Sequence, residues 1–162
     1  MFKALKACHE RKIVHRDLKP ENIMIETDLS RVYLSDFGLG MRIPSHGTVK
    51  GRAGTPCYYS YEMVKQIPYD TRLDLWCLGV LLFEMLYGEL PFKADEKTGD
   101  LSGAIERLEF TIPKVKGVGP EAGELIKRLL VPEAERADAA EIEAHPWFNK
   151  TVFEMEEEEL QA

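Results

Sequence analysis

The sequence has little of what marks secreted, metal-binding or membrane-spanning proteins. Its three cysteines, Cys8, Cys57 and Cys77, leave one unpaired in any disulfide scheme and lack the spacing of a metal site. The longest apolar run, residues 75–86, falls short of the ~20 residues that cross a bilayer. The amino-terminal segment has no continuous apolar stretch of a signal peptide. These absences predict a cytoplasmic or nuclear protein with free thiols and no membrane contact.

Positive charge is also scarce in this chain. Lys and Arg number 21 against 28 Asp and Glu, which gives a net charge of -7. Such a charge repels nucleic acid and anionic membranes as non-specific partners and favours a basic protein or peptide instead. A length of 162 residues is enough for one hydrophobic core, so a single domain is expected.

Two motifs that are present carry a definite chemistry. Residues 15–22 read HRDLKPEN, and Ser35-Asp36-Phe37-Gly38 comes directly after a strand-like run at 31–34. Phosphoryl transfer needs an acceptor for the proton of the attacking hydroxyl and oxygen ligands for Mg²⁺, and this pattern supplies both. Further elements follow in a fixed order: Gly54-Thr55, Ser60-Tyr61-Glu62, DLWCLGV at 74–80, Arg136, and His145-Pro146-Trp147-Phe148.

Taken together, these motifs resemble the catalytic and metal-binding loops of eukaryotic protein kinases, over about residues 2–148. Stretches 69–92, 106–113 and 124–130 are most similar to serine/threonine kinases of the Aurora and NIMA-related kind. The resemblance implies a mainly α fold, the kinase C-lobe, in which a helical bundle surrounds a buried central helix. A short β-hairpin would carry the catalytic and metal loops.

The same resemblance predicts a partial kinase domain. Residues 1–148 would be the C-lobe, and 149–162 an acidic, disordered tail. The glycine-rich phosphate loop, the strand lysine, the helix glutamate and the hinge of the family do not occur in this sequence, so the N-lobe is expected to be absent.

Local patterns predict the secondary structure. Residues 23–25 and 32–34 alternate across a polar turn as in a short hairpin, and 38–54 is polar and glycine-rich, as in a mobile activation loop. One helical turn is expected at 62–65. The buried helix should run from 71 to 87 and end at Gly88. Three more helices are predicted at 101–108, 121–130 and 137–144.

The catalytic residues follow from the motif chemistry. Asp17 is the expected base, because a carboxylate near the substrate hydroxyl orients it and accepts its proton. Lys19 places a positive charge at the γ-phosphate of ATP, while Asn22 and Asp36 are the expected Mg²⁺ ligands. The residues expected to hold the ATP–Mg²⁺ cofactor are Lys19, Glu21, Asn22, Met24 and Asp36.

Three residues are expected to meet the protein substrate, namely Glu21, Thr55 and Glu84. By resemblance, Lys19 and Thr55 mark specificity for serine and threonine hydroxyls. Glu21 and Glu84 match positions that bind an arginine upstream of the acceptor, which predicts a preference for basic residues there. The alternative for both glutamates is an ordinary surface or helix charge.

The remaining motif residues are expected to support the site. His15 and Phe37 should pack in an apolar column, and Gly38 completes the metal loop. Asp74, at the start of a buried helix, requires hydrogen bonds, and the resemblance supplies them from the catalytic-loop backbone. Glu62 and Arg136 match a buried ion pair.

Regulation by loop phosphorylation is less clear from the sequence. Arg16 matches the residue that pairs with a loop phosphate, but Gly51 occupies the usual phosphorylated position. Thr48 or Ser45 would replace it only in a rearranged loop. The chain also departs from the family pattern at Tyr61 and Ala137, where proline is usual, which should alter packing more than chemistry.

Two functions therefore remain open. One is the larger lobe of an active serine/threonine protein kinase. The other is a catalytically inactive kinase-like module that binds partners. In either case the apolar surface around Met24 and Phe37 would be exposed, which predicts aggregation or a covering partner. Weak or no ATP binding is expected for residues 1–162 alone.

Overall fold

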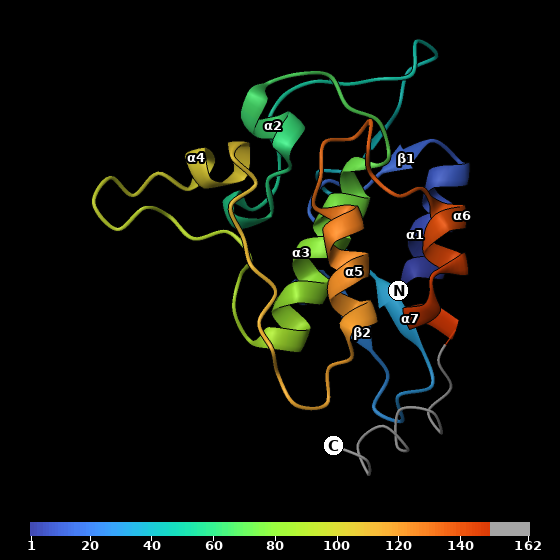
Figure 1. Cartoon of the computed structure of the whole chain (residues 1–162). Coiled ribbons are helices and arrows are strands. Elements are labelled where there is room, and N and C mark those ends of the chain that lie inside the picture. Colours follow the sequence, from blue (N-terminus) through green and yellow to red (C-terminus); the bar gives the residue numbers. More distant parts are fainter. Residues whose placement is uncertain (150–162) are drawn as a thin grey trace.

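The computed structural model describes residues 1–149, so the predicted acidic tail at 149–162 lies almost wholly outside the described residues. The described part is largely helical (Figure 1). Its helices are α1 (Phe2–Glu10), α2 (Tyr61–Lys65), α3 (Leu73–Tyr87), α4 (Leu101–Glu106), α5 (Pro120–Leu129), α6 (Ala139–Ala144) and α7 (Pro146–Asn149). Its strands are β1 (Ile13–Val14), β2 (Ile23–Ile25), β3 (Val32–Leu34) and β4 (Met41–Arg42), with 3-10 turns η1 (Pro20–Asn22) and η2 (Pro56–Tyr58).

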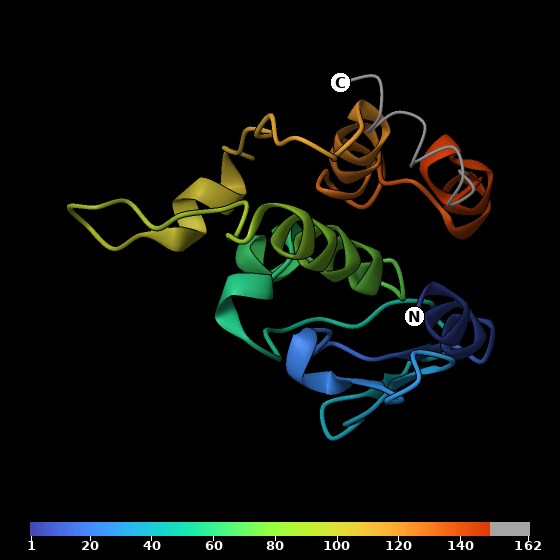
Figure 2. The same ribbon diagram turned by 90° about the horizontal axis from the view of Figure 1, so that it is seen from below.

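Helix α3 is the centre of the fold, as the apolar run predicted. Every residue from 73 to 83 is buried. Seen from below, α3 lies between α5 on one side and α1 with the strands on the other (Figure 2). A Cβ on Gly79 would lie 2.8 Å from Leu129 Cβ, so only glycine allows α3 and α5 to approach this closely. A helix segment buried on all sides has to be apolar all round, which α3 is from Leu75 to Phe83.

Both ends of α3 follow from local chemistry. Gly88 ends the helix in the left-handed conformation at φ 71°. The helix starts at Leu73, two residues later than predicted, because the Asp70 carboxylate accepts a hydrogen bond from the Arg72 backbone N–H at 2.7 Å. Such an Asx turn competes with helical hydrogen bonding.

Two small antiparallel strand pairs lie on the other side of α3. Strands β2 and β3 form the predicted hairpin, with Met24 opposite Tyr33. Strands β1 and β4 also pair, and Ile13 lies opposite Arg42. The second pair corrects the expectation of a wholly irregular loop at 38–54, as does the antiparallel bridge between Val49 and Tyr69.

The carboxy-terminal helices differ from the predictions mainly at their ends. Helix α4 ends at Glu106 and not at 108. Helix α6 begins at Ala139 because Asp138 and Glu141 form a capping box, which excludes 137 and 138 from the helix. Helix α7 was not predicted, and its Phe148 ring lies 5.4 Å from the ring of Phe2 in α1. This contact brings the two ends of the described chain together.

Within residues 1–149, no helix has both the length and the apolar character needed to span a bilayer.

Candidate functional site

The predicted base sits in a closed hydrogen-bond network. Asp17 is buried, with 7% of its surface exposed. Thr55 Oγ1 donates to Asp17 Oδ1 at 2.8 Å, and Lys19 Nζ lies 2.9 Å from Asp17 Oδ2. Lys19 Nζ also donates to Thr55 Oγ1 at 2.9 Å, while Asn22 Nδ2 donates to Asp17 Oδ2 at 3.1 Å. Four polar side chains predicted to act together are therefore in direct contact.

The electrostatics of this network keep Asp17 ionised and Lys19 protonated. Burial pushes the pKa of Asp17 upward, but hydrogen bonds from Lys19, Thr55 and Asn22 outweigh it, and the pKa is lowered overall. The hydrogen bond to Asp17 raises the pKa of Lys19, with smaller contributions from the carboxylates of Glu21 and Asp36. Asp36 is therefore within electrostatic range of this network.

Backbone contacts bring the metal motif beside the catalytic motif. Ser35 donates to the carbonyl of Asn22 from both its backbone N–H, at 2.9 Å, and its hydroxyl, at 3.0 Å. Asp36 comes next in the chain, at φ 56°, a left-handed conformation that aspartate tolerates better than most residues. Its Oδ1 accepts the Gly38 backbone N–H at 3.1 Å.

These residues fit a magnesium ion in their chemistry. Asn22 uses its amide nitrogen on Asp17, which leaves the amide oxygen for a cation. Asp36 is exposed and has a second carboxylate oxygen. No group of three or more His, Cys, Asp and Glu side chains in the described ranges could hold a metal by itself. A magnesium site here would need phosphate and water oxygens as well, which is the usual arrangement for this ion.

Gly54 allows the two halves of the network to meet. It adopts φ +89°, and a Cβ there would lie 2.2 Å from the Arg16 carbonyl oxygen and 3.1 Å from Asp17 Oδ1. Any side chain would push Thr55 away from the catalytic loop. The Gly54-Thr55 pair thus has a steric reason as well as a chemical one.

Asp74 holds the backbone that leads into Asp17. Its carboxylate is fully buried and accepts the backbone N–H groups of His15, at 2.8 Å, and Arg16, at 2.9 Å. His9 Nε2 lies 2.9 Å from the same carboxylate. Arg16 has φ 69°, a conformation unfavourable for a long side chain, and the bonds to Asp74 keep it in place.

The side chains of the two motifs also touch. The ring of Phe37 lies 4.7 Å from that of His15, edge to face, but Phe37 is 42% exposed, so the described residues cover only part of it. Arg16 Nε donates to the Leu39 carbonyl at 2.7 Å. The structure therefore places Arg16 on the chain just after Gly38, whereas Thr48 and Ser45 lie further along the same segment.

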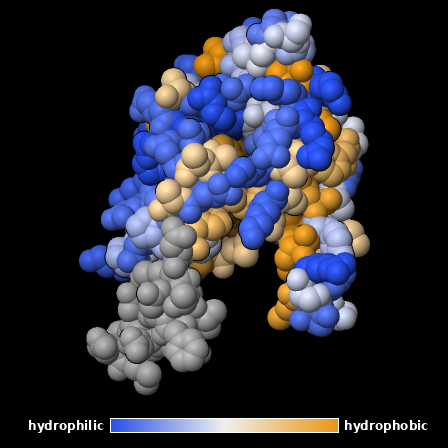
Figure 3. Space-filling model, turned by 90° about the vertical axis from the view of Figure 1, so that its right-hand side faces the viewer, coloured by the Kyte–Doolittle hydropathy of each residue, from blue (hydrophilic) through white to orange (hydrophobic). Residues whose placement is uncertain are grey.

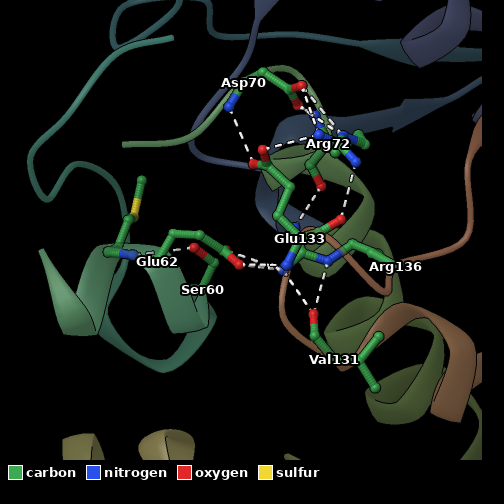
Figure 4. Close-up of polar contacts among 8 residues, drawn as sticks. Ser60, Glu62, Asp70, Arg72, Val131, Glu133 and Arg136 are labelled. Carbon is green, nitrogen blue, oxygen red and sulfur yellow. Dashed lines mark hydrogen bonds and ion pairs between the residues drawn. The ribbon is translucent and has the colours of Figure 1, made fainter. Parts of the chain in front are cut away.

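A second polar network connects α2 to the segment between α5 and α6 (Figure 4). Arg136 Nη2 donates to both oxygens of Glu62 at 2.9 Å, and these two side chains are 0% and 2% exposed. Arg136 also donates to the carbonyls of Val131 and Arg72. The Glu133 backbone N–H donates to Glu62 Oε1 at 2.7 Å. The predicted buried pair is thus present with further bonds that offset the cost of burying the charges.

Known proteins with similar sequences identify the family. The family described as protein kinase domain matches residues 1–148. Serine/threonine-protein kinase PEPKR2 of Arabidopsis thaliana is 41% identical over 143 residues, which are 86% of this chain and 30% of that protein. Aurora kinase C of Mus musculus is 39% identical over 145 residues, 89% of this chain and 51% of that protein.

This chain belongs to the protein kinase domain family. A third relative, the calcium/calmodulin-dependent protein kinase type II alpha chain of Drosophila melanogaster, is 38% identical over 153 residues, 91% of this chain and 29% of that protein. The chain thus spans about half or less of the length of these relatives. The whole proteins contain further sequence that has no counterpart in the match.

The two glutamates predicted to bind substrate lie in different environments. Glu21 is exposed, in the 3-10 turn η1. Glu84, on α3, accepts a short hydrogen bond from the Tyr58 hydroxyl. Burial, together with the hydrogen bond to Glu84, raises the pKa of Tyr58 well above its usual value, so the phenol stays a donor. In this kinase-family chain one Glu84 oxygen is already engaged, while Glu21 is open to solvent.

The hairpin of this kinase-family chain presents an apolar surface. Met24 is 59% exposed, and large apolar side chains of the two strands and the following loop are exposed with it. Figure 3 shows hydrophobic side chains along the arm that projects downward, with hydrophilic ones at its tip. We call this surface the hairpin patch: Met24, Ile25, Val32, Tyr33, Phe37 and Leu39.

Several contacts in the site were not predicted from the sequence. His9 contacts Asp74 across 65 positions and Tyr58 contacts Glu84 across 26, separations at which no local pattern links two residues. Arg52 donates to the carbonyls of Met63 and Val64, near the carboxy-terminal end of α2. A basic side chain near a helix end is a known signal, but Arg52 precedes α2 in the chain and could not be assigned to it.

Proposed function

We propose that this chain is the larger, carboxy-terminal lobe of a serine/threonine protein kinase of the Aurora or NIMA-related kind, and that it transfers the γ-phosphate of ATP to Ser and Thr hydroxyls of protein substrates. The observation that carries the proposal is the contact of Asp17 with Lys19, Thr55 and Asn22 in one network. The similarity to Aurora kinase C supports the kind of kinase.

In this proposal Asp17 acts mainly by orienting the substrate hydroxyl. Its lowered pKa makes it a weak base, so its carboxylate positions the nucleophile first and takes the proton late in the reaction. Thr55 and Lys19 fix the carboxylate in one orientation. The Lys19 ammonium, held 2.9 Å from Asp17, is also placed to neutralise negative charge close to the attacking oxygen.

Asn22 and Asp36 would hold the Mg²⁺ of Mg-ATP, and Met24 would contact its adenine ring. Mg-ATP supplies the phosphoryl group when bound, and the metal neutralises charge on it. Met24 offers an apolar platform, since its side chain is 59% exposed on the hairpin patch. We propose that Glu21 and Glu84 favour a substrate with basic residues before the acceptor. A positional peptide library with no enrichment of Arg or Lys would contradict this.

A decisive experiment joins the nucleotide-binding half of a protein kinase to the amino terminus of this chain. Phosphate transfer from radiolabelled ATP to a serine peptide should fall by about 10² to 10⁴ when Asp17 is changed to Asn. Asp28→Asn is the matched control, because Asp28 is exposed and its carboxylate accepts a hydrogen bond from the backbone N–H of nearby Ser30. Activity of Asp17→Asn within a few-fold of the parent would show that Asp17 is not catalytic.

The isolated chain should bind Mg-ATP weakly or not at all. The hairpin patch would contact only one face of the adenine ring and leave the other face in solvent. Calorimetric titration tests this directly, and low-micromolar affinity would contradict it.

The exposed hairpin patch also favours a second function, that of a kinase-like module that binds a partner without catalysis. Met24 and Tyr33 face one side of the hairpin and Ile25 and Val32 the other, so both of its faces expose apolar side chains. Exposed apolar side chains gathered in one region mark interaction sites. The two functions are separable, because an inactive module would show no transfer in the chimera, and its partner would be captured equally by the parent and by Asp17→Asn.

A further inference from the structure

A groove of about 550 Å³ lies outside the site described above. It opens between the end of α3, the segment 112–119 and the first turns of α5. Apolar side chains form much of its wall: Tyr87, Ile112, Pro113, Val115 and Val118. None of the proposed catalytic, metal or substrate residues lines it, so its shape serves some other purpose.

The groove also gathers positive charge. Lys114, Lys116 and Lys127 line it, and we call it the lysine groove. All three are exposed and make no ion pair or side-chain hydrogen bond with other residues in the part of the chain that the structure describes. Glu124 is the one carboxylate in the lining. On a protein with a net charge of -7, three neighbouring unpaired lysines favour an anionic occupant.

Four other lysines of the described residues form ion pairs, whereas Lys3, Lys12, Lys50 and Lys97 do not. Lys6 lies 2.8 Å from Glu143, Lys65 lies 3.2 Å from Glu106 and Lys93 lies 2.7 Å from Glu89. The lysine groove differs in that three unpaired lysines line one hollow.

The wall of the groove is fixed before anything binds. A Cβ on Gly123 would lie 2.8 Å from Ile112 Cγ2, so segment 112–119 begins in close contact with α5. Because this contact depends on a glycine in a helix, the spacing between α5 and the segment is set by backbone packing. A preformed groove loses less entropy when it is occupied.

We propose that the lysine groove binds the acidic segment 154–159 of the same chain. This segment reads EMEEEE, and it is flanked by Phe153 and Leu160. Its carboxylates match the three lysines, and its apolar side chains match the wall formed by Ile112 and Val115. Charge and apolar surface thus agree between groove and segment.

The segment is within reach of the groove. Helix α7 ends at Asn149 and packs against α5, and Figure 2 shows α5 between α7 and the segment that forms the far wall. The path half-way around a helix whose diameter with side chains is about 10 to 12 Å is roughly 16 to 19 Å long. Seven to ten extended residues, from Asn149 to the glutamates at 156–159, span at most about 23 to 36 Å, which is enough. A tethered segment has an effective concentration near millimolar, which favours it over an acidic partner protein.

Zero-length crosslinking of the full chain with a carbodiimide tests the contact, because it joins a lysine to a carboxylate only where they touch. Crosslinks from glutamates 154–159 should go to Lys114, Lys116 and Lys127 several-fold more often than to Lys3. Lys3 is the demanding control, since its neighbour Phe2 contacts Phe148, close to the end of the described chain. In 1 M salt, where the screening length is about 3 Å, the preference should fall.

Charge reversal supplies the second arm. The triple variant replaces Lys114, Lys116 and Lys127 by glutamate. A glutamate-specific protease should cleave this variant at 154–159 faster than it cleaves the parent. The control triple variant Lys12→Glu, Lys50→Glu and Lys97→Glu, at exposed positions elsewhere, should match the parent. Equal crosslinking to Lys3 would overturn the proposal. So would crosslinks found only between molecules in an isotope-mixed sample, which would assign the groove to a second copy.

Discussion

The two sides of α3 differ in how completely their polar groups are paired and their apolar groups are buried. On the helical side, Glu62 and Arg136 are almost wholly buried and every one of their charges has partners. On the hairpin side, Met24 and Phe37 are 59% and 42% exposed, next to the metal motif. Structural residues of the kinase motifs thus find their partners within this chain, whereas the residues proposed to face the nucleotide present an open surface.

The difference indicates where a change should be costly. Buried charges leave an uncompensated partner when one member is removed, whereas exposed side chains lose little. Four substitutions test this comparison, and they are ordered here by the size of the expected effect.

Changing Glu62 to Gln should have the largest effect. It leaves the buried Arg136 guanidinium without its counter-charge, and the free energy of unfolding should fall by about 3 to 5 kcal/mol. Urea denaturation measures this. The matched control is Glu143→Gln, which removes an exposed ion pair with Lys6 and should cost much less, because solvent screens exposed pairs. Equal losses in the two variants would contradict the asymmetry.

Changing Gly54 to Ala should come next, at about 1 to 3 kcal/mol for the left-handed backbone alone. The new Cβ would also approach the Arg16 carbonyl to 2.2 Å, so Thr55 should leave Asp17. Nuclear magnetic resonance titration of Asp17 checks this, because losing the Thr55 donor should raise the pKa of Asp17. Gly47→Ala is the control, since its φ is +92° and no atom lies within 4 Å of the added Cβ.

The contribution of Asp17 should depend on pH. Because its folded pKa is below the usual 3.8, its hydrogen bonds stabilise the fold fully above that value and are lost as pH falls through the folded pKa. Urea unfolding of the parent and Asp17→Asn should therefore differ most near neutral pH and converge below about pH 4. A gap that widens on acidification would contradict the lowered pKa.

Changing Met24 to Ser should have the smallest effect on folding, within about 0.5 kcal/mol, because the side chain is already exposed. Light scattering should instead show less self-association, since the change breaks the hairpin patch. Leu81→Ser, in the buried part of α3, is the contrasting variant and should unfold the protein. A large loss of stability for Met24→Ser would mean that the patch is covered.

Much of this outcome could be predicted from local sequence. The hairpin at 23–25 and 32–34 follows from alternation, and the end of α3 follows from Gly88. The capping box of Asp138 and Glu141 was also readable, although the helix was predicted to start two residues earlier. The β1 and β4 pair could not be predicted, because two-residue strands have no periodicity and lie about 28 positions apart.

The sequence by itself determined the chemistry and the order of the motifs, because proton acceptors, metal ligands and turn residues are defined by side-chain type and short spacing. Only the tertiary structure decided which of them touch. It joined His9 to Asp74, Tyr58 to Glu84 and Thr55 to Asp17, and left the hairpin patch in solvent. The physical reason is that these contacts depend on how elements far apart in the chain pack around α3, and no local pattern encodes that packing.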